Sequence, residues 1–126
     1  MLNNILGSHI NDVQNALSRT TQRQALLTAN LANENVPGYK RQDVDFHVAL
    51  QDQIKGSLSQ AEIDQKDRTS QAQSDATSIR TDGNNVDEER EVTGIAETSL
   101  HYSALTAMAE DYFSGLKSVI HEGRAG

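Results

Sequence analysis

The sequence contains no cysteine and no tryptophan, and aromatic residues make up only 4% of its 126 positions. Without cysteine the chain can form neither a disulfide framework nor a thiolate metal site. Because only 36% of the residues are hydrophobic, there is little material for a self-sufficient core. We therefore expect the isolated chain to be marginally stable and to need a partner surface to complete its burial.

Positive charge is also scarce, since 11 Lys and Arg against 18 Asp and Glu give a formal net charge of −7. This balance argues against a nucleic-acid binder, which needs a cationic surface. The largest basic cluster is the pair Lys40 and Arg41, so we expect no electrostatic membrane patch. No apolar run approaches the length of a membrane span, and residues 1–6 lack the features of a Sec signal peptide.

Motifs for catalysis and metal binding are missing as well. No histidine pair has HxxxH or HExxH spacing, and surface or hydrogen-bonded histidines are the simpler interpretation. These histidines are His9, His47, His101 and His121. Residues 82–87 resemble a calcium loop in composition, but Val86 stands where an oxygen ligand is needed. Because no nucleophile elbow or phosphate-binding loop occurs either, we expect no enzyme, no cofactor and no metal.

What the sequence does contain is a pair of long helical patterns, of which the first covers about residues 8–33. Its apolar or small side chains step by four and three, as in a heptad-like seam. The seam consists of Leu6, Ile10, Val13, Leu17, Thr20, Gln24, Leu27 and Leu31. The pattern fits a core helix of a small bundle or a helix that packs on other subunits, and periodicity does not separate the two.

A proline turn ends this helix. Pro37 cannot continue a helix, and it biases Val36 toward an extended conformation. In the sequence Val36-Pro37-Gly38-Tyr39, proline and glycine occupy the two central positions of a type II turn.

The residues after the turn predict a short helix over about 46–55 that ends at Gly56. One face of it would carry Phe46, Ala49, Leu50 and Ile54. A short strand is the competing interpretation, because Val44, Phe46 and Val48 alternate with polar residues.

Residues 57–81 are dominated by Ser, Gln, Asp and Thr, with only isolated apolar side chains. Such a segment cannot bury enough apolar surface to offset its ordering entropy. We expect an extended or disordered connection that becomes ordered only against a partner, and a solvated linker is the simpler interpretation. A turn follows it, in which Asn85 and Glu88 resemble a capping box for the next helix.

The second long helix is predicted over about residues 86–121, with apolar or small residues at steps of three and four. They are Val92, Ile95, Ser99, Tyr102, Thr106, Ala109, Phe113, Leu116 and Ile120, broadened by Leu105, Tyr112 and Val119. A pattern sustained over this length indicates a coiled-coil-like surface.

The predicted fold is therefore all-α, with the two long helices packed as an antiparallel coiled-coil-like pair. Its segments are an N-terminal helix (1–35), the turn and short helix (36–56), a polar linker (57–85) and a C-terminal helix (86–126). Surplus apolar surface would remain for neighbouring subunits. The residues predicted to form this assembly interface are Leu17, Leu27, Leu31, Ile95, Tyr102, Leu105, Tyr112, Phe113, Leu116 and Ile120.

The first helix and its turn carry a recognisable motif, ANLAN at 29–33 followed by VPGYK at 36–40. It resembles the N-terminal signature of bacterial flagellar rod and hook proteins, with Val36 where threonine is commoner. The motif and turn residues are Asn30, Leu31, Ala32, Asn33, Pro37, Gly38 and Tyr39. DVDF at 43–46 and DGNNVD at 82–87 are similar to the short proximal-rod members, and the chain has no room for the β-rich insertion of hook and distal-rod members.

This resemblance implies a structural subunit of the periplasmic, cell-proximal rod, which links the membrane ring to the hook. Such proteins are exported through the flagellar type III apparatus without a cleaved Sec signal, and they pack around a central channel. The implied neighbours are other copies of the chain, the rod-base adaptor FliE and the rod protein FlgC, with the MS-ring protein and the export gate as further candidates. Nucleic acid and direct membrane insertion are not implied.

A soluble helical adaptor or secretion chaperone is the alternative function. The acidic charge and the amphipathic helices fit it too. Such a protein would fold alone as a compact dimer and would stay in the cytoplasm.

Overall fold

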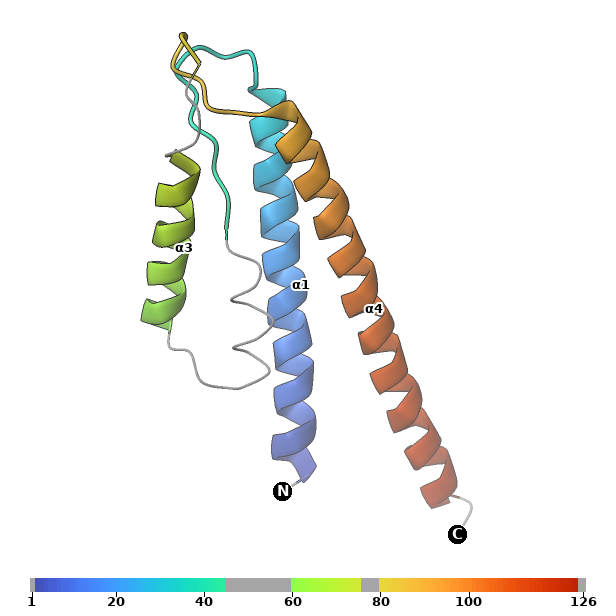
Figure 1. The fold of residues 1–126 in the computed structure, drawn as a ribbon. Coiled ribbons are helices and arrows are strands. Elements are labelled where there is room, and N and C mark those ends of the chain that lie inside the picture. The colour runs from blue at the N-terminus through green and yellow to red at the C-terminus, as the bar shows by residue number, and fades with distance from the viewer. Residues whose placement is uncertain (1, 45–59, 76–79, 125–126) are drawn as a thin grey trace.

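The computed structural model describes residues 2–44, 60–75 and 80–124 (Figure 1). These residues form the helices α1 (Leu2–Ala32), α3 (Gln60–Asp75) and α4 (Glu88–Arg124), and they contain no strand. The predicted all-α fold class is confirmed. Within the described ranges, no helix carries an apolar stretch of the length that a bilayer crossing requires.

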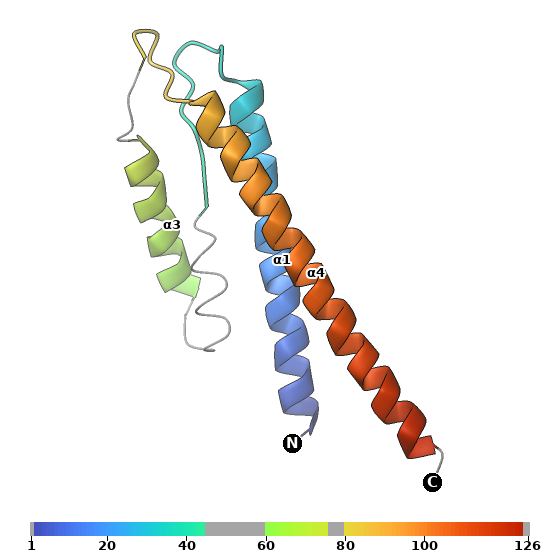
Figure 2. The same ribbon diagram turned by 45° about the vertical axis from the view of Figure 1, so that its right-hand side comes forward.

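The two long helices α1 and α4 pack against each other in antiparallel orientation, as predicted (Figures 1 and 2). The helix α1 already begins at Leu2, and α4 continues to Arg124. The predicted cap of α4 is wrong, because Asp87 rather than Asn85 accepts a hydrogen bond from the first turn, at 3.2 Å from the backbone nitrogen of Arg90. Asn85 instead bonds to another part of the chain, as described below.

Few of the described residues form a buried apolar core. The hydrophobic ones among them that are buried are Ala16, Leu27, Val86 and Leu105. The buried polar and charged residues are Thr20, Asn30, Arg41, Asn84, Asn85, Glu91 and Thr98. The interior of the fold therefore depends on satisfied hydrogen bonds as well as on apolar contact.

The predicted type II turn is present. The backbone nitrogen of Tyr39 donates to the carbonyl oxygen of Val36 at 3.2 Å, and Gly38 has a φ of 74°, which glycine adopts without steric cost. A second turn ends at Gly83 and lies against the first, since the nitrogen of Gly38 donates to the carbonyl oxygen of Asp82 at 2.9 Å. The two turns together close one end of the helix pair.

The prediction of an extended connection over 57–81 is wrong for Gln60–Asp75, which forms α3. Good helix formers such as Gln, Ala, Glu, Lys and Arg are frequent in it, and they favour a helix even without an apolar stripe. The helix runs alongside α1 (Figures 1 and 2), where Asp67 forms an ion pair with Arg19. The short helix predicted over 46–55 lies outside the described residues.

Candidate functional site: the turn end and the open end

We use the name turn end for residues 30–44 together with 80–91, where α1 finishes and α4 begins. It is organised around a buried ion pair. Nε of Arg41 donates to Oε1 of Glu91 at 2.6 Å, and the two side chains are 2% and 0% exposed. Nη2 of Arg41 also lies 3.3 Å from Oδ2 of Asp43. These charge-assisted bonds fix the segment after the turn against α4.

The guanidinium of Arg41 remains charged although it is buried. Burial by itself lowers the pKa of Arg41, but the hydrogen bond and the attraction of Glu91, and then those of Asp43, outweigh it and raise the pKa above its ordinary value. Removing one partner of this pair would leave a desolvated charge.

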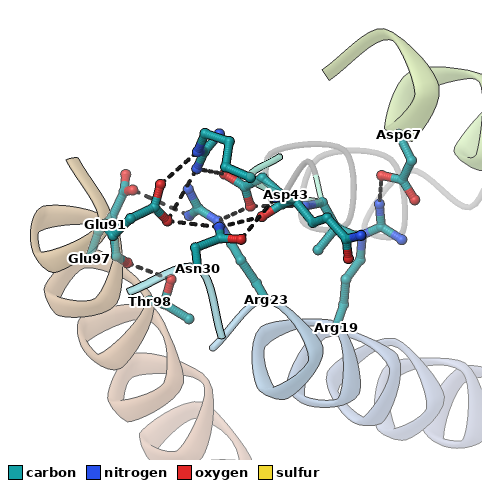
Figure 3. A network of polar contacts seen from close by, with 12 residues as sticks. Arg19, Arg23, Asn30, Asp43, Asp67, Glu91, Glu97 and Thr98 are labelled. Atoms are coloured by element: carbon teal, nitrogen blue, oxygen red, sulfur yellow. Dashed lines mark hydrogen bonds and ion pairs between the residues drawn. The ribbon is translucent and has the colours of Figure 1, made fainter. Parts of the chain in front are cut away.

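Asn30 of the motif connects this ion pair to the turn (Figure 3). Its Nδ2 donates to Oε2 of Glu91 at 2.9 Å and to the carbonyl oxygen of Gln42 at 2.7 Å. Its Oδ1 accepts from the nitrogen of Gln42 at 2.9 Å and from the hydroxyl of Tyr39 at 3.2 Å. Both donors and both lone pairs of the amide are thus used. An aspartate at this position could not make the two donated bonds.

Asn84 holds the segment after α1 from the second turn. Its Nδ2 lies 2.8–3.0 Å from the carbonyl oxygens of Asn33, Glu34 and Val36. Its Oδ1 accepts from the nitrogen of Val86 at 2.8 Å. These carbonyls belong to the segment that follows α1, which ends at Ala32, so a residue distant in sequence fixes the path of the chain out of the helix. The neighbouring Asn85 accepts from the backbone nitrogen of Arg41 at 2.7 Å.

Two more arginines extend the network along α1. Arg23 bridges the segment after the turn and α4, because its Nε lies 3.1 Å from Oδ1 of Asp43 and its Nη1 lies 3.3 Å from Oε2 of Glu97. One turn earlier, Arg19 pairs with Asp67 of α3 (Figure 3). The arginines of α1 therefore link this helix to the segment after the turn, to α4 and to α3.

Sequence reasoning missed Arg41 and Glu91. In the sequence Arg41 is only half of a small basic pair, and Glu91 is not part of the predicted apolar stripe of the second long helix. A signal for Glu91 was present, because positions 91, 98 and 105 are spaced by seven and Leu105 belongs to the predicted stripe. A charged residue on the inner face of a helix requires a buried partner.

The predicted interface residues occupy different places in the chain. Leu27 and Leu105 are buried between α1 and α4 and thus serve the core of the chain itself. The half-buried members are Leu17, Leu31, Ile95, Tyr112 and Leu116. The exposed members are Tyr102, Phe113 and Ile120. Of the motif and turn, Asn30 is buried, Leu31, Asn33 and Tyr39 are half-buried, and Ala32, Pro37 and Gly38 are exposed.

The open end is the opposite end of the pair, comprising residues 9–17 of α1 and 108–124 of α4, where the two helices diverge (Figures 1 and 2). A groove of about 530 Å³ lies between them. It is lined by His9, Ile10, Val13, Gln14, Leu17, Met108, Ala109, Tyr112 and Phe113. Val119 and Ile120, further along α4, are 68% and 69% exposed. Exposed apolar side chains near an apolar groove are typical of interaction sites.

Residues 11–40, which hold most of α1, the motif and the turn, match the family model described as "Flagella basal body rod protein". Among the described residues, no group of three or more His, Asp or Glu side chains is placed to hold a metal ion. The helix pair, its motif and this match define the class of the protein, which is a structural component of the flagellar basal-body rod and not an enzyme.

Curated relatives extend the similarity over nearly the whole chain. The chain is 33% identical over 122 residues to the flagellar basal body rod protein FlgB of Bacillus subtilis (strain 168), covering 91% of this chain and 95% of that protein. It is 31% identical over 127 residues to FlgB of Salmonella typhimurium and 29% identical over 125 residues to FlgB of Escherichia coli (strain K12), each covering 87% of this chain and 91% of the relative. The chain belongs to the FlgB family of flagellar basal body rod proteins, which confirms the resemblance that its motif indicated.

Proposed function

We propose that the chain is a subunit of the cell-proximal part of the rod and that it assembles by helix–helix packing around a central export channel. One observation carries this proposal: a chain with near full-length similarity to rod proteins leaves the apolar surface of its open end unfilled. Additional burial of that surface, at ~25 cal/mol per Å² of apolar area, requires a neighbour.

In this proposal torque passes between subunits through the packed helix faces, from the membrane ring to the distal rod and hook. The half-buried and exposed residues of α4, Tyr112, Phe113, Leu116 and Ile120, form the contact. The turn end contributes rigidity within each subunit, because Glu91 of α4 binds both Arg41 after the turn and Asn30 of α1.

The neighbours we propose are other copies of the chain, the rod-base adaptor FliE and the rod protein FlgC, with the MS-ring protein and the export gate at the rod base. The location is the periplasmic rod, reached through the flagellar type III apparatus without a cleaved Sec signal. A small apolar core and the absence of cysteine support passage as an unfolded chain, since no disulfide has to be broken before export.

A complementation experiment tests the assembly function. In a strain that lacks its own copy, Leu116→Asp should abolish motility and prevent rod formation on isolated basal bodies, because the aspartate would place a charge in a buried contact. The control is Leu100→Asp, since Leu100 is 70% exposed and lies outside the groove. Circular dichroism of the purified Leu116→Asp variant shows whether it folds. If it does not fold, Phe113→Asp is used in its place. Normal rods with the folded variant, as with the Leu100→Asp control, would refute the proposal.

The exposed face of the turn is proposed as a second contact with a neighbouring subunit. Tyr39 also bonds to Asn30 within the chain, so its two roles need separate variants. Tyr39→Phe removes only the intrachain bond, whereas Tyr39→Ala removes the ring as well. We expect near-normal motility with phenylalanine and a clear loss with alanine in a swimming assay. Unimpaired motility with alanine would exclude a contact through Tyr39.

A further inference from the structure

The second turn of the turn end contains a pair of residues with an intrinsic chemical weakness. Asp82 is the one aspartate in the sequence that a glycine follows, and no asparagine precedes a glycine. Because glycine has no Cβ, nothing shields its backbone nitrogen from the side chain of the residue before it. Asp82-Gly83 is therefore the place in this chain where a carboxyl side chain most readily cyclises onto the backbone and becomes isoaspartate.

Isoaspartate forms in two steps. The nitrogen of Gly83 attacks Cγ of Asp82, so that a C–N bond forms and the C–OH bond of the protonated carboxyl group breaks. The hydroxyl group and the amide proton leave as water. A water molecule then opens the cyclic imide at either carbonyl group, and opening at the original main-chain carbonyl produces isoaspartate. The first step needs a nitrogen that is free to attack and a carboxyl group that carries a proton.

The folded turn restrains both of these groups. The backbone nitrogen of Gly83 donates to the carbonyl oxygen of Arg80 at 2.8 Å. Oδ1 of Asp82 accepts from the backbone nitrogen of Asn84 at 3.1 Å, and Oδ2 accepts from Nη2 of Arg80 at 2.8 Å. The bond from Asn84, and then the one from Arg80, lower the pKa of Asp82. The carboxyl group therefore stays ionised, which is the form that loses water least readily.

Contacts with the first turn prevent the second one from rearranging. The nitrogen of Gly38 donates to the carbonyl oxygen of Asp82 at 2.9 Å, and Nζ of Lys40 donates to that of Gly83 at 2.5 Å. A Cβ built on Gly83 would lie 3.5 Å from Cα of Gly38, so the two turns are in close contact. Asn84 adds its bonds to the segment that follows α1. The reactive pair can therefore move only when the two turns separate.

We propose that the paired turns protect Asp82-Gly83 from isoaspartate formation, and that a chain already isomerised there cannot close its turn end. The second part follows from the structure of the product. Isoaspartate lengthens the backbone by one carbon atom before Gly83, and the carbonyl oxygen that Gly38 binds becomes part of a side-chain carboxylate. Asn84 then no longer reaches its three carbonyl partners. The inference concerns the single chain and does not depend on the proposed rod function.

Peptide mapping of the purified full chain tests the protection. Trypsin cleaves after Arg80 and Arg90 and releases residues 81–90 with the reactive pair inside. The chain is incubated in native buffer or in guanidinium chloride, and the isoaspartyl form of this peptide is quantified by chromatography and mass spectrometry. We expect formation to be at least about tenfold slower in the native chain, because only molecules with an open turn react. Equal rates in the two conditions would overturn the proposal.

Loosening the contact between the turns should accelerate the reaction in the native chain. Asn84→Ala removes three bonds to the segment after α1, and we expect isoaspartate to form about tenfold faster in native buffer. The matched control Asn35→Ala removes an exposed amide that bonds to the adjacent Glu34, and its rate should not change. In guanidinium chloride all of these chains should react at one rate, because no turn is left to protect the pair.

A milder variant covers the case in which Asn84→Ala does not fold, as judged by circular dichroism. Lys40→Met removes the bond from Nζ to the carbonyl oxygen of Gly83, and Lys40 is exposed, so the buried network of the turn end is kept. We expect its native rate to rise about threefold. A folded variant of either kind that reacts as slowly as the natural chain would contradict protection by the paired turns.

The isomerised chain itself tests the second part of the proposal. It is separated by reversed-phase chromatography after incubation in guanidinium chloride and is then returned to native buffer. Hydrogen exchange should show that the amides of Gly38 and Val86 have lost their protection, because their acceptors are Asp82 and Asn84. Protection equal to that of the natural chain would show that the turn end closes in spite of the longer backbone, and this part of the proposal would then be wrong.

Discussion

The two ends of the α1 and α4 pair use opposite kinds of packing. At the turn end, Asn30, Arg41 and Glu91 are 2% exposed or less, and each forms hydrogen bonds inside the chain. At the open end, Met108 and Ile120 are more than half exposed. The buried polar network of the turn end finds its partners within one molecule, whereas the apolar side chains of the open end remain exposed. The network therefore defines the fold of the subunit, and the apolar surface is left for neighbours.

The difference follows from the physics of the two kinds of contact. A buried hydrogen-bonded pair contributes little net stability, but it penalises every arrangement in which one partner loses the other. Apolar contact is not directional and can be completed by any suitably shaped partner. A polar turn end can therefore set the register of α1 against α4, while an apolar open end can accept a surface from another molecule.

The largest effect is expected from breaking the buried ion pair. Glu91→Ala leaves the buried guanidinium of Arg41 without its main partner and removes an acceptor from Asn30. We expect the free energy of unfolding to fall by about 3–5 kcal/mol, measured by urea denaturation. The control Glu97→Ala removes an acid that is 45% exposed from Arg23, and its loss should be about 0–1 kcal/mol. Similar losses for both variants would contradict the central role of the turn end.

Removing both members of the same ion pair separates the loss of the pair from the cost of one unpaired buried charge. The double variant Arg41→Met with Glu91→Leu removes both charges together, so the free energy of unfolding should recover to within about 1–2 kcal/mol of the natural chain. We expect the helix register to become less unique, with broader amide signals in NMR spectra. If the double variant is as unstable as Glu91→Ala, then apolar packing does not replace the hydrogen bonds that join Glu91 to Asn30 and Arg41 to Asp43.

A smaller effect is expected at Asn84, which holds the segment that follows α1. Asn84→Ala leaves the carbonyl oxygens of Asn33, Glu34 and Val36 without their shared donor, at a cost of about 1–3 kcal/mol. Hydrogen exchange should show the loss of protection at the turn end and not along the open end of α4. The control is Asn35→Ala, because Asn35 is exposed and its side chain bonds to the adjacent Glu34. Loss of protection spread evenly over both helices would contradict a local role.

The sequence predicted the features that have a local cause. The stripe from Ile10 to Leu31 indicated α1, and Pro37 with Gly38 indicated the type II turn, because backbone chemistry decides both. Periodicity also predicted α4, but it could not separate residues that pack within the chain from those that pack between chains. Leu105 is buried against α1 and Phe113 is 57% exposed, although both belong to one predicted stripe.

The turn-end network could not be predicted in the same way, because its partners lie far apart in the sequence. Nothing local to Arg41 indicates that its charge meets Glu91, and nothing local to Asn84 indicates that its amide binds the segment that follows α1. The failure at α3 has a different cause. Its residues have good helix propensity, and a composition rule for disorder gave too little weight to that propensity.

The smallest predicted effect compares one glycine from each end of α4. Alanine is favoured over glycine in a helix by about 1 kcal/mol, and a Cβ built on Gly115 meets no atom within 4 Å. Gly115→Ala should therefore raise the free energy of unfolding by about 0.5–1 kcal/mol. A Cβ on Gly94 would lie 3.1 Å from Cδ1 of Leu27, which is buried. Gly94→Ala should thus gain nothing in urea denaturation, because the contact strain offsets the propensity.

Equal gains at both glycines would mean that α1 and α4 pack no more tightly near the turn end than at the open end, which would contradict the difference between the two ends. The two variants also separate the free chain from the assembly. If Gly115→Ala stabilises the isolated subunit but impairs rod formation, then a neighbour approaches α4 closely at the position where the free chain has open space. That outcome would show that the open end is completed by another molecule.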